Sequence, residues 1–178
     1  KKIELDITDT QLQQFDDYYR FLVEKNKVMN LTTIIEKEDV VLKHFIDSIY
    51  IMKYTDFDEK KVIDIGTGAG FPGIPLAIMN PQTSFVLLDS LNKRINFLNE
   101  VCNLCNLSNV ITIHGRAEEI SRKEEYREKF DYVVSRAVAN MSTLLEYCTP
   151  FLKVGGQFIS YKSGKVEEEL SGAQNAMK

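Results

Sequence analysis

The most chemically suggestive part of the sequence is a glycine-rich segment that follows a hydrophobic run. Residues 62–65 read VIDI and residues 66–73 read GTGAGFPG, so that Gly66, Gly68 and Gly70 alternate with other residues before a predicted helix. Glycines at such a turn let a ligand approach the main chain, and the free N–H groups at a helix start face that ligand. The spacing is G-x-G-x-G, not the dinucleotide pattern G-x-G-x-x-G, so it indicates a nucleotide-like ligand without identifying it.

Further polar residues follow the next β-rich runs. Asp89 ends one such run 23 positions after Gly66, where a carboxylate accepts hydrogen bonds from both ribose hydroxyls of an adenosine. The alternative is an ordinary solvated carboxylate at a strand end. Ligands of open parallel sheets bind beyond the carboxyl ends of the strands. We therefore expect Gly66, Asp89, Ala117, Glu118 and Arg136 to converge.

The elements that must position these residues follow from the period of the hydrophobic pattern. Short β-rich runs occur at residues 62–65, 85–89, 110–113, 132–134 and 157–161, with helix-like stretches between them. This alternation predicts an α/β fold with a doubly wound, mostly parallel sheet covered by helices on both faces. We assign this core to residues 61–178.

Residues 1–60 instead have a helical period. Thr8 and Gln11 have the spacing of a capping box, and a second helix is expected near residues 37–53. Each predicted helix carries an apolar stripe that requires a larger partner. Residues 1–60 are therefore predicted to form a helical cap on the core.

Composition restricts the class of protein. The 178 residues include 22 Lys and Arg against 26 Asp and Glu, a net charge of −4, and no run approaches the ~20 apolar residues of a membrane span. Because three cysteines cannot all form disulfide bonds with one another, we expect reduced thiols. We expect a soluble, cytoplasmic and monomeric protein without an obligate protein partner. Its total charge is negative and so does not favour binding to nucleic acid.

Taken together, these motifs resemble those of the class I S-adenosylmethionine-dependent methyltransferases, and more closely those of the bacterial RsmG family, also called GidB. The segments that carry the resemblance are Asn30-Leu31-Thr32, His44 with Asp47-Ser48, the residues 64–73, Leu88-Asp89-Ser90 with Lys93-Arg94, and Ser135-Arg136-Ala137. The glycine segment alone is generic. Its combination with the upstream and downstream segments is specific, and the match covers nearly the whole chain.

The resemblance implies methyl transfer from S-adenosylmethionine to N7 of a guanine in the decoding-region loop of 16S ribosomal RNA. It implies a Rossmann-like core in which the cofactor is contacted by Gly66, Gly68, Gly70, Phe71, Asp89, Ala117, Glu118 and Arg136. Asp89 would bind the ribose, and Arg136 would also position the reactants. Family members usually continue past the fifth strand with a helix and two strands, so the resemblance predicts a core truncated at its C-terminus.

The chemistry of guanine N7 agrees with what the sequence does not contain. This nitrogen has a lone pair and no proton, so its methylation needs positioning and exclusion of water more than a general base. An exocyclic-amine enzyme would carry an Asn/Asp-Pro-Pro-aromatic motif where Ser135 and Arg136 stand. A pyrimidine C5 enzyme would need a nucleophilic cysteine, whereas Cys102 and Cys105 fall on an apolar helical stripe. No metal site is predicted.

Contacts to RNA would come from local groups, namely His44, Asp47, Lys93, Arg94 and Lys162. Small basic clusters pair Lys25 with Lys27, Lys43 with His44, Lys93 with Arg94 and Lys162 with Lys165, and each could equally be a solvated surface. His44 and Asp47 could also serve helix packing alone. A different class of function stays open at this point, a nonenzymatic nucleotide-binding module that uses the same crevice as a sensor.

Overall fold

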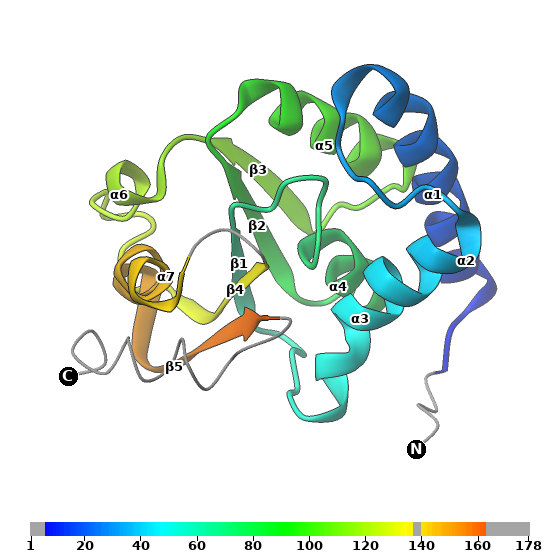
Figure 1. Ribbon diagram of the computed structural model, residues 1–178. Helices are drawn as coiled ribbons and strands as arrows, with labels where there is room; N and C mark the ends of the chain where they lie inside the picture. The colour runs from blue at the N-terminus through cyan, green and yellow to red at the C-terminus, as the bar shows by residue number, and fades with distance from the viewer. Residues whose placement is uncertain (1–5, 137–139, 163–178) are drawn as a thin grey trace.

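The computed structural model describes residues 6–136 and 140–162 (Figure 1). Ala137 and Lys165, which the sequence analysis named, lie outside these described residues. The strands are β1 (Lys61–Ile65), β2 (Ser84–Asp89), β3 (Val110–His114), β4 (Phe130–Arg136) and β5 (Leu152–Tyr161). The helices are α1 (Asp9–Met29), α2 (Lys37–Val40), α3 (Asp47–Ile49), α4 (Gly73–Met79), α5 (Asn92–Leu104), α6 (Ala117–Ile120) and α7 (Met141–Cys148), with π- or 3-10-helical turns at Val41–Ile46 (η1), Tyr50–Lys53 (η2) and Thr149–Phe151 (η3).

The five described strands form one parallel sheet in the order β3-β2-β1-β4-β5. The chain moves from β1 outward to β3 and then returns to the other side of β1 to add β4. Because the loops after β1 and β4 therefore diverge, a crevice opens at the carboxyl ends of these central strands. This arrangement confirms the predicted doubly wound sheet and places the expected ligand site at that edge.

Helices cover both faces of the sheet (Figure 1). The alternation of side chains along β1 explains the layers, since Ile63 and Ile65 pack in the cluster that includes residues of α6 and α7, whereas Val62 packs with residues of α4. Nearly the whole of α4 is buried because the sheet lies on one side of it and the N-terminal helices lie on the other. The N-terminal helices thus extend one layer of the core.

Helix α1 begins at the predicted capping box. The Thr8 hydroxyl accepts a hydrogen bond from the Gln11 N–H, and the Gln11 side chain accepts one from the Thr8 N–H. Phe15, Tyr18 and Leu22 form its buried stripe, so the aromatic residues of this helix serve as core. The Tyr18 hydroxyl also donates to the carbonyl oxygen of Ala69 at 2.5 Å, which ties α1 to the glycine segment.

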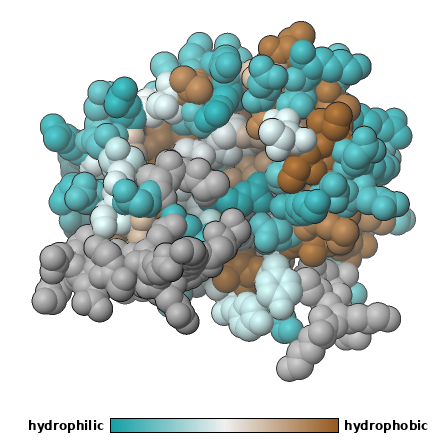
Figure 2. All heavy atoms as spheres, viewed as in Figure 1, coloured by the Kyte–Doolittle hydropathy of each residue, from teal (hydrophilic) through white to brown (hydrophobic). Residues whose placement is uncertain are grey.

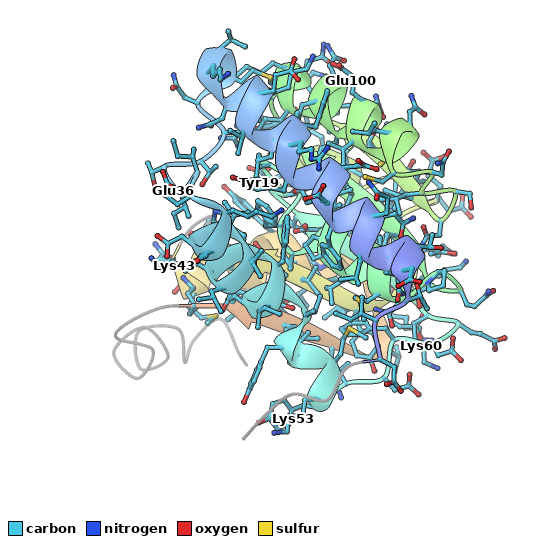
Figure 3. All side chains as sticks on the ribbon, turned by 90° about the vertical axis from the view of Figure 1, so that its right-hand side faces the viewer. Tyr19, Glu36, Lys43, Lys53, Lys60 and Glu100 are labelled. Carbon is cyan, nitrogen blue, oxygen red and sulfur yellow. The ribbon has the colours of Figure 1, made fainter. Side chains whose placement is uncertain are left out.

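The second N-terminal helix is a rod made of several helix types. It runs from α2 through the π-helical turn η1 and α3 to the 3-10 turn η2, over Lys37–Lys53, and so matches the predicted span. Figure 3 shows α1 lying between this rod and α5, with Lys43 on the outer side of the rod. The π-helical turn contains His44, and such turns are frequent at functional sites.

The N-terminal helices leave some apolar surface in contact with solvent. A cavity of about 300 Å³ lies between α1 and the rod and is lined mainly by hydrophobic residues such as Leu12, Phe15 and Val41. Figure 2 shows hydrophobic side chains reaching the surface on this side of the molecule. Among residues 6–136 and 140–162, no helix combines the length and hydrophobicity that crossing a bilayer requires.

Candidate functional site

The glycine segment turns sharply at the carboxyl end of β1. Gly66, Gly68 and Gly70 have φ angles of 69°, 63° and 100°, a region that residues with a Cβ rarely adopt. The N–H groups of Gly66 and Thr67 both donate to the carbonyl oxygen of Leu88, at 2.9 and 3.1 Å. The turn is thereby fixed to the end of β2, with its main chain open to the crevice.

Asp89 holds the glycine segment from the neighbouring strand. One carboxylate oxygen, Oδ2, accepts from the N–H of Gly68 at 2.9 Å, and Oδ1 accepts from the N–H of Leu91 at 2.9 Å. Arg94 lies 3.3 Å from Oδ2. A carboxylate oxygen accepts more than one hydrogen bond, so these contacts orient Asp89 and leave it capacity for hydroxyl groups of a ligand. The alternative of a solvated carboxylate is wrong, because Asp89 is only 2% exposed.

Two cavities meet beside Asp89. The one next to β3, called the β3 cavity below, has a volume of about 180 Å³ and is lined by Ile65, Gly66, Leu88, Asp89, Ser90, Gly115, Arg116, Ala117, Glu118 and Tyr147. The other, called the cap cavity, has a volume of about 410 Å³ and is lined by Leu31, Thr32, His44, Gly66, Thr67, Gly68, Ala69, Phe71, Asp89, Ser90, Arg94 and Arg136. Gly66, Asp89 and Ser90 line both cavities, so together the two form one elongated crevice.

Most of the residues singled out from the sequence line this crevice. Ala117 and Glu118 belong to the β3 cavity, whereas Phe71 and Arg136 belong to the cap cavity. The N-terminal helices contribute His44 to the same cap cavity, and Arg94 reaches it from α5. The structure therefore brings together side chains from five separate segments of the chain.

Four of the candidate residues do not line either cavity. Gly70 serves packing, because a Cβ there would lie 2.7 Å from Ile74 and 2.9 Å from Leu98 and the Tyr18 hydroxyl. Asp47 forms an ion pair with Arg136 at 3.2 Å, and Lys93 is an exposed residue of α5. Lys162 directly follows β5, whose last residue pairs with Arg136 in the sheet.

Arg136 joins the sheet to the N-terminal helices. Its guanidinium donates to Asp47 Oδ2 at 3.2 Å and to His44 Nδ1 at 3.4 Å, and it lies over the Phe71 ring at 4.9 Å from the centroid. His44 stacks on the same ring at a centroid distance of 4.5 Å. Burial and the nearby Arg136 charge lower the pKa of His44 to about 4. His44 is therefore neutral at pH 7 and forms a wall of the cap cavity with Arg136.

Asp64 is a buried carboxyl group beneath the glycine segment. Its Oδ2 accepts from the Thr67 hydroxyl at 2.8 Å and from the Gly73 N–H at 2.9 Å, and Oδ1 has no hydrogen-bond partner among the described residues. Burial is the main reason that the pKa of Asp64 rises to about 7. Asp64 joins both ends of the glycine segment, a role that was not predicted from the sequence. An acidic residue inside a hydrophobic strand was the available signal.

The cysteines have the character of core residues. Cys105 and Cys148 are buried and Cys102 is half-buried, and all three are free thiols. Burial raises the pKa of Cys102 to about 11 and that of Cys105 to about 12, so neither forms a thiolate readily at neutral pH. Within the described part of the chain, no group of three or more His, Cys, Asp or Glu side chains is placed to hold a metal ion.

Several residues of the crevice were not among the predicted site residues. Ser90 and Arg116 directly adjoin predicted ones, so their positions were readable from the sequence. Leu31 and Thr32 come from the loop after α1, and Tyr147 comes from α7. Leu31 and Thr32 belong to a segment that carries the family resemblance, but only the packing of separate elements brings them and Tyr147 to the crevice.

Comparison with known proteins gives consistent relatives. The family model described as rRNA small subunit methyltransferase G matches residues 11–178. A protein named ribosomal RNA small subunit methyltransferase G from Lachnoclostridium phytofermentans is 54% identical over 178 residues, which is 99% of this chain and 74% of that protein. One of the same name from Clostridium perfringens is 52% identical over 176 residues, 98% of this chain and 74% of that protein.

Solved structures of methyltransferases share the fold. An S-adenosylmethionine-dependent O-methyltransferase from Thermotoga maritima matches 87% of this chain and 54% of its own with a TM-score of 0.59 at 16% identity. Precorrin-6y C5,15-methyltransferase from Geobacter metallireducens matches 84% of this chain and 73% of its own with a TM-score of 0.58 at 15% identity. At such identities the likeness extends to the Rossmann-like fold, while the sequence matches define the family. With the crevice, the family model and relatives above 50% identity in agreement, the chain belongs to the rRNA small subunit methyltransferase G (GidB) family.

Proposed function

We propose that this protein transfers the methyl group of S-adenosylmethionine to N7 of a guanine in the decoding-region loop of 16S ribosomal RNA. The observation that carries the proposal is the single crevice in which the β3 cavity and the cap cavity meet at Gly66 and Asp89. One end suits a nucleoside and the other is walled by the N-terminal helices. Membership of the rRNA small subunit methyltransferase G family indicates that the substrate is ribosomal RNA.

The residues of the crevice fit S-adenosylmethionine. We assign Asp89, whose carboxylate is held by the N–H groups of Gly68 and Leu91, to the two ribose hydroxyls, and we assign Ala117 and Glu118, which line the β3 cavity with it, to the adenine. The left-handed backbone at Gly66 and Gly68 leaves no side chain between the main chain and the methionine half. The bound cofactor supplies an electrophilic methyl group on a sulfonium.

The residues around the cap cavity would orient the target base and exclude water from it. Arg136 and His44 form a rigid wall because each contacts the other and both lie on the Phe71 ring. Holding two reactants in line is itself a large part of catalysis for a nucleophile as exposed as guanine N7. We assign to Arg136 the role of positioning the target base, because its contacts with Asp47, His44 and Phe71 hold the guanidinium in place.

A nitrogen without a proton suits this site. The neutral His44 has both ring nitrogens in hydrogen bonds, to Thr32 and Arg136, so it is not poised to remove a proton from a substrate. The raised pKa values of the cysteines likewise argue against covalent attack on a pyrimidine. Both features favour methylation of a ring nitrogen that already presents a lone pair.

The proposal is tested by transfer of a labelled methyl group to small ribosomal subunits that lack this modification, followed by mapping of the modified nucleotide. We expect one guanine to be modified at N7. Arg136→Ala should lower the rate of transfer by at least about tenfold, because it removes a charged hydrogen-bond donor from the wall. Arg122→Ala, at an exposed arginine, is the matched control and should transfer at the normal rate.

Two outcomes would contradict parts of this proposal. Binding of S-adenosylmethionine without any transfer to the subunits would refute the methyltransferase assignment and favour a sensor. Full activity of Arg136→Ala would remove Arg136 from the site and leave the reaction itself intact. Calorimetry with S-adenosylmethionine, NAD and ATP identifies the bound cofactor independently of transfer.

A further inference from the structure

Thr32 is held in a fixed position at the cap cavity. The Asn26 side chain clamps its backbone on both sides, since Asn26 Oδ1 accepts from the Thr32 N–H and Asn26 Nδ2 donates to the Thr32 carbonyl oxygen, each at 2.9 Å. Asn26 Oδ1 also accepts from the N–H of Leu31 at 2.6 Å. The loop after α1 is therefore built to place the Thr32 side chain, which lines the cap cavity.

The lone pairs of the Thr32 hydroxyl are already used. Its Oγ1 accepts from the N–H of Ile34 at 3.1 Å and lies 2.9 Å from His44 Nε2. Arginine has no acceptor, so the contact between Arg136 and His44 Nδ1 requires Nδ1 to accept. A neutral imidazole that accepts at Nδ1 carries its proton on Nε2 and donates it to Thr32. The lowered pKa of His44 agrees with this neutral form.

These contacts give the Thr32 hydroxyl a single remaining role. A threonine hydroxyl normally serves as donor or acceptor and so distinguishes poorly between bases. With both lone pairs occupied, Thr32 has only its O–H hydrogen to offer, and among the described residues no acceptor is assigned to that hydrogen. A ligand in the cap cavity must therefore present an acceptor to Thr32.

Besides N7, whose lone pair takes the methyl group, the same edge of the purine provides an acceptor only in guanine. Beside N7, guanine presents the acceptor O6, whereas adenine presents the donor N6–H₂. Thr32 lines the same cavity as Gly66 and Gly68, which suit the methionine half of the cofactor. A base that enters this cavity can therefore present its N7 edge to both the methyl group and Thr32.

We propose that Thr32 selects guanine by donating its hydroxyl hydrogen to O6 of the target base, and that Arg136 and His44 enforce this by fixing the hydroxyl as a donor. The inference rests on the proposed function and deepens it. Thr32 is the specificity-determining residue, and His44 is a positioning residue that acts through Thr32.

The test measures transfer to small subunits that contain either guanine or 2-aminopurine at the methylated position. The analogue keeps N7 and lacks O6. Thr32→Val should lower kcat/KM by roughly tenfold on guanine and by much less on 2-aminopurine, because only guanine forms the lost hydrogen bond. Thr32→Ser should restore the guanine rate. Thr33→Val, at the exposed neighbouring threonine, is the matched control.

A second variant tests the positioning role without removing the hydroxyl. His44→Phe keeps a ring on Phe71 and removes Nε2–H, which frees a lone pair of Thr32 Oγ1 to accept from N6 of adenine. The preference of the enzyme for guanine over adenine at the target position should therefore fall by roughly tenfold. An unchanged preference would contradict the role of His44 in the proposal.

The outcomes separate this inference from the proposed function. An equal loss on guanine and 2-aminopurine in Thr32→Val would overturn the contact to O6. Loss of affinity for S-adenosylmethionine in Thr32→Val, measured by calorimetry, would assign the hydroxyl to the cofactor and would also overturn it. If the unaltered protein does not methylate guanine-containing subunits at all, the proposed function fails and the inference fails with it.

Discussion

His44 shows how one residue's ionisation follows from its neighbours. Its ring is packed on Phe71, receives a hydrogen bond from Arg136 and contacts the Thr32 hydroxyl. Burial and the Arg136 charge both disfavour the imidazolium, so the folded protein keeps this ring neutral far below the usual histidine range. The same neutrality prevents repulsion between two cationic groups at the wall of the cap cavity.

We expect His44 to titrate near pH 4 in the folded protein, against 6.5 for an unperturbed histidine. Because the folded pKa is the lower one, the contribution of His44 to stability is present above about pH 6.5 and is lost as the pH falls toward 4. NMR of the imidazole signals measures the pKa directly. The chain has two histidines, so His114→Asn leaves one signal to assign. Arg136→Ala should raise the pKa of His44, because it removes the nearby positive charge. An unchanged pKa would contradict the contribution of Arg136.

At the scale of residues, the sequence predicted which residues line the site better than it predicted which side chains contact one another. Asp89 was predicted to contact a ligand from its spacing to the glycine segment, and its place in both cavities agrees with that reasoning. The hydrogen bonds of Thr32 depend on a loop, a helix and a strand that are far apart in the chain. No pattern within one segment of the sequence indicates which lone pairs of the Thr32 hydroxyl already accept a hydrogen bond.

At the scale of elements, the glycine segment and α4 behave as one unit around Asp64. The carboxyl group accepts from Thr67 near the start of the segment and from the N–H of Gly73 at the start of α4. Gly73 has no room for a side chain, because a Cβ would lie 2.3 Å from Leu87 Cδ2 and 2.8 Å from Asp64 Oδ2. The glycine is thus required by packing of α4 against β1 and β2.

Gly73→Ala should destabilise the protein by about 1–3 kcal/mol, the usual cost of overpacking a buried contact. Displacement of Asp64 would also weaken its hydrogen bond to the helix start. The midpoint of urea unfolding measures the loss, and Lys93→Ala, at an exposed position of α5, is the control. A midpoint for Gly73→Ala equal to that of the control would show that Leu87 adjusts freely.

The elements themselves were predicted well where their period is local. Each β-rich run became a strand, and the capping box marked the first helix correctly. The extent of β5 was underestimated, since it begins at Leu152 and its pairing with β4 is irregular between Phe130 and Tyr132. The π-helical turn at Val41–Ile46 was also not foreseen, because an apolar stripe reads alike for α and π geometry.

At the scale of the whole molecule, charge is arranged in local pairs. Lys25 pairs with Glu100 and Lys43 with Asp39, each at 2.7–2.8 Å, so two of the predicted basic clusters are partly neutralised at the surface. With a net charge of −4, long-range attraction to RNA is weak. We therefore expect contact with phosphates to come from individual exposed cations such as Lys93.

Affinity for the small ribosomal subunit should fall by at least about tenfold as the salt concentration rises from about 50 to about 200 mM, as expected for a few phosphate contacts. Lys93→Glu should weaken binding and flatten this dependence if the exposed Lys93 meets a phosphate. Filter binding over a salt series measures both, with affinity for S-adenosylmethionine as the reference. An interaction with the subunit that does not respond to salt would count against phosphate contacts.

The meeting of the two cavities at Gly66, Asp89 and Ser90 has a thermodynamic consequence. A ligand that spans it behaves as two tethered fragments, because seating one end raises the effective concentration of the other. Adenosine alone or methionine alone lacks this tethering, because each would occupy only one of the two cavities. We expect the demethylated cofactor to occupy both cavities as well and to retain most of this tethering, so that its release after methyl transfer is slow.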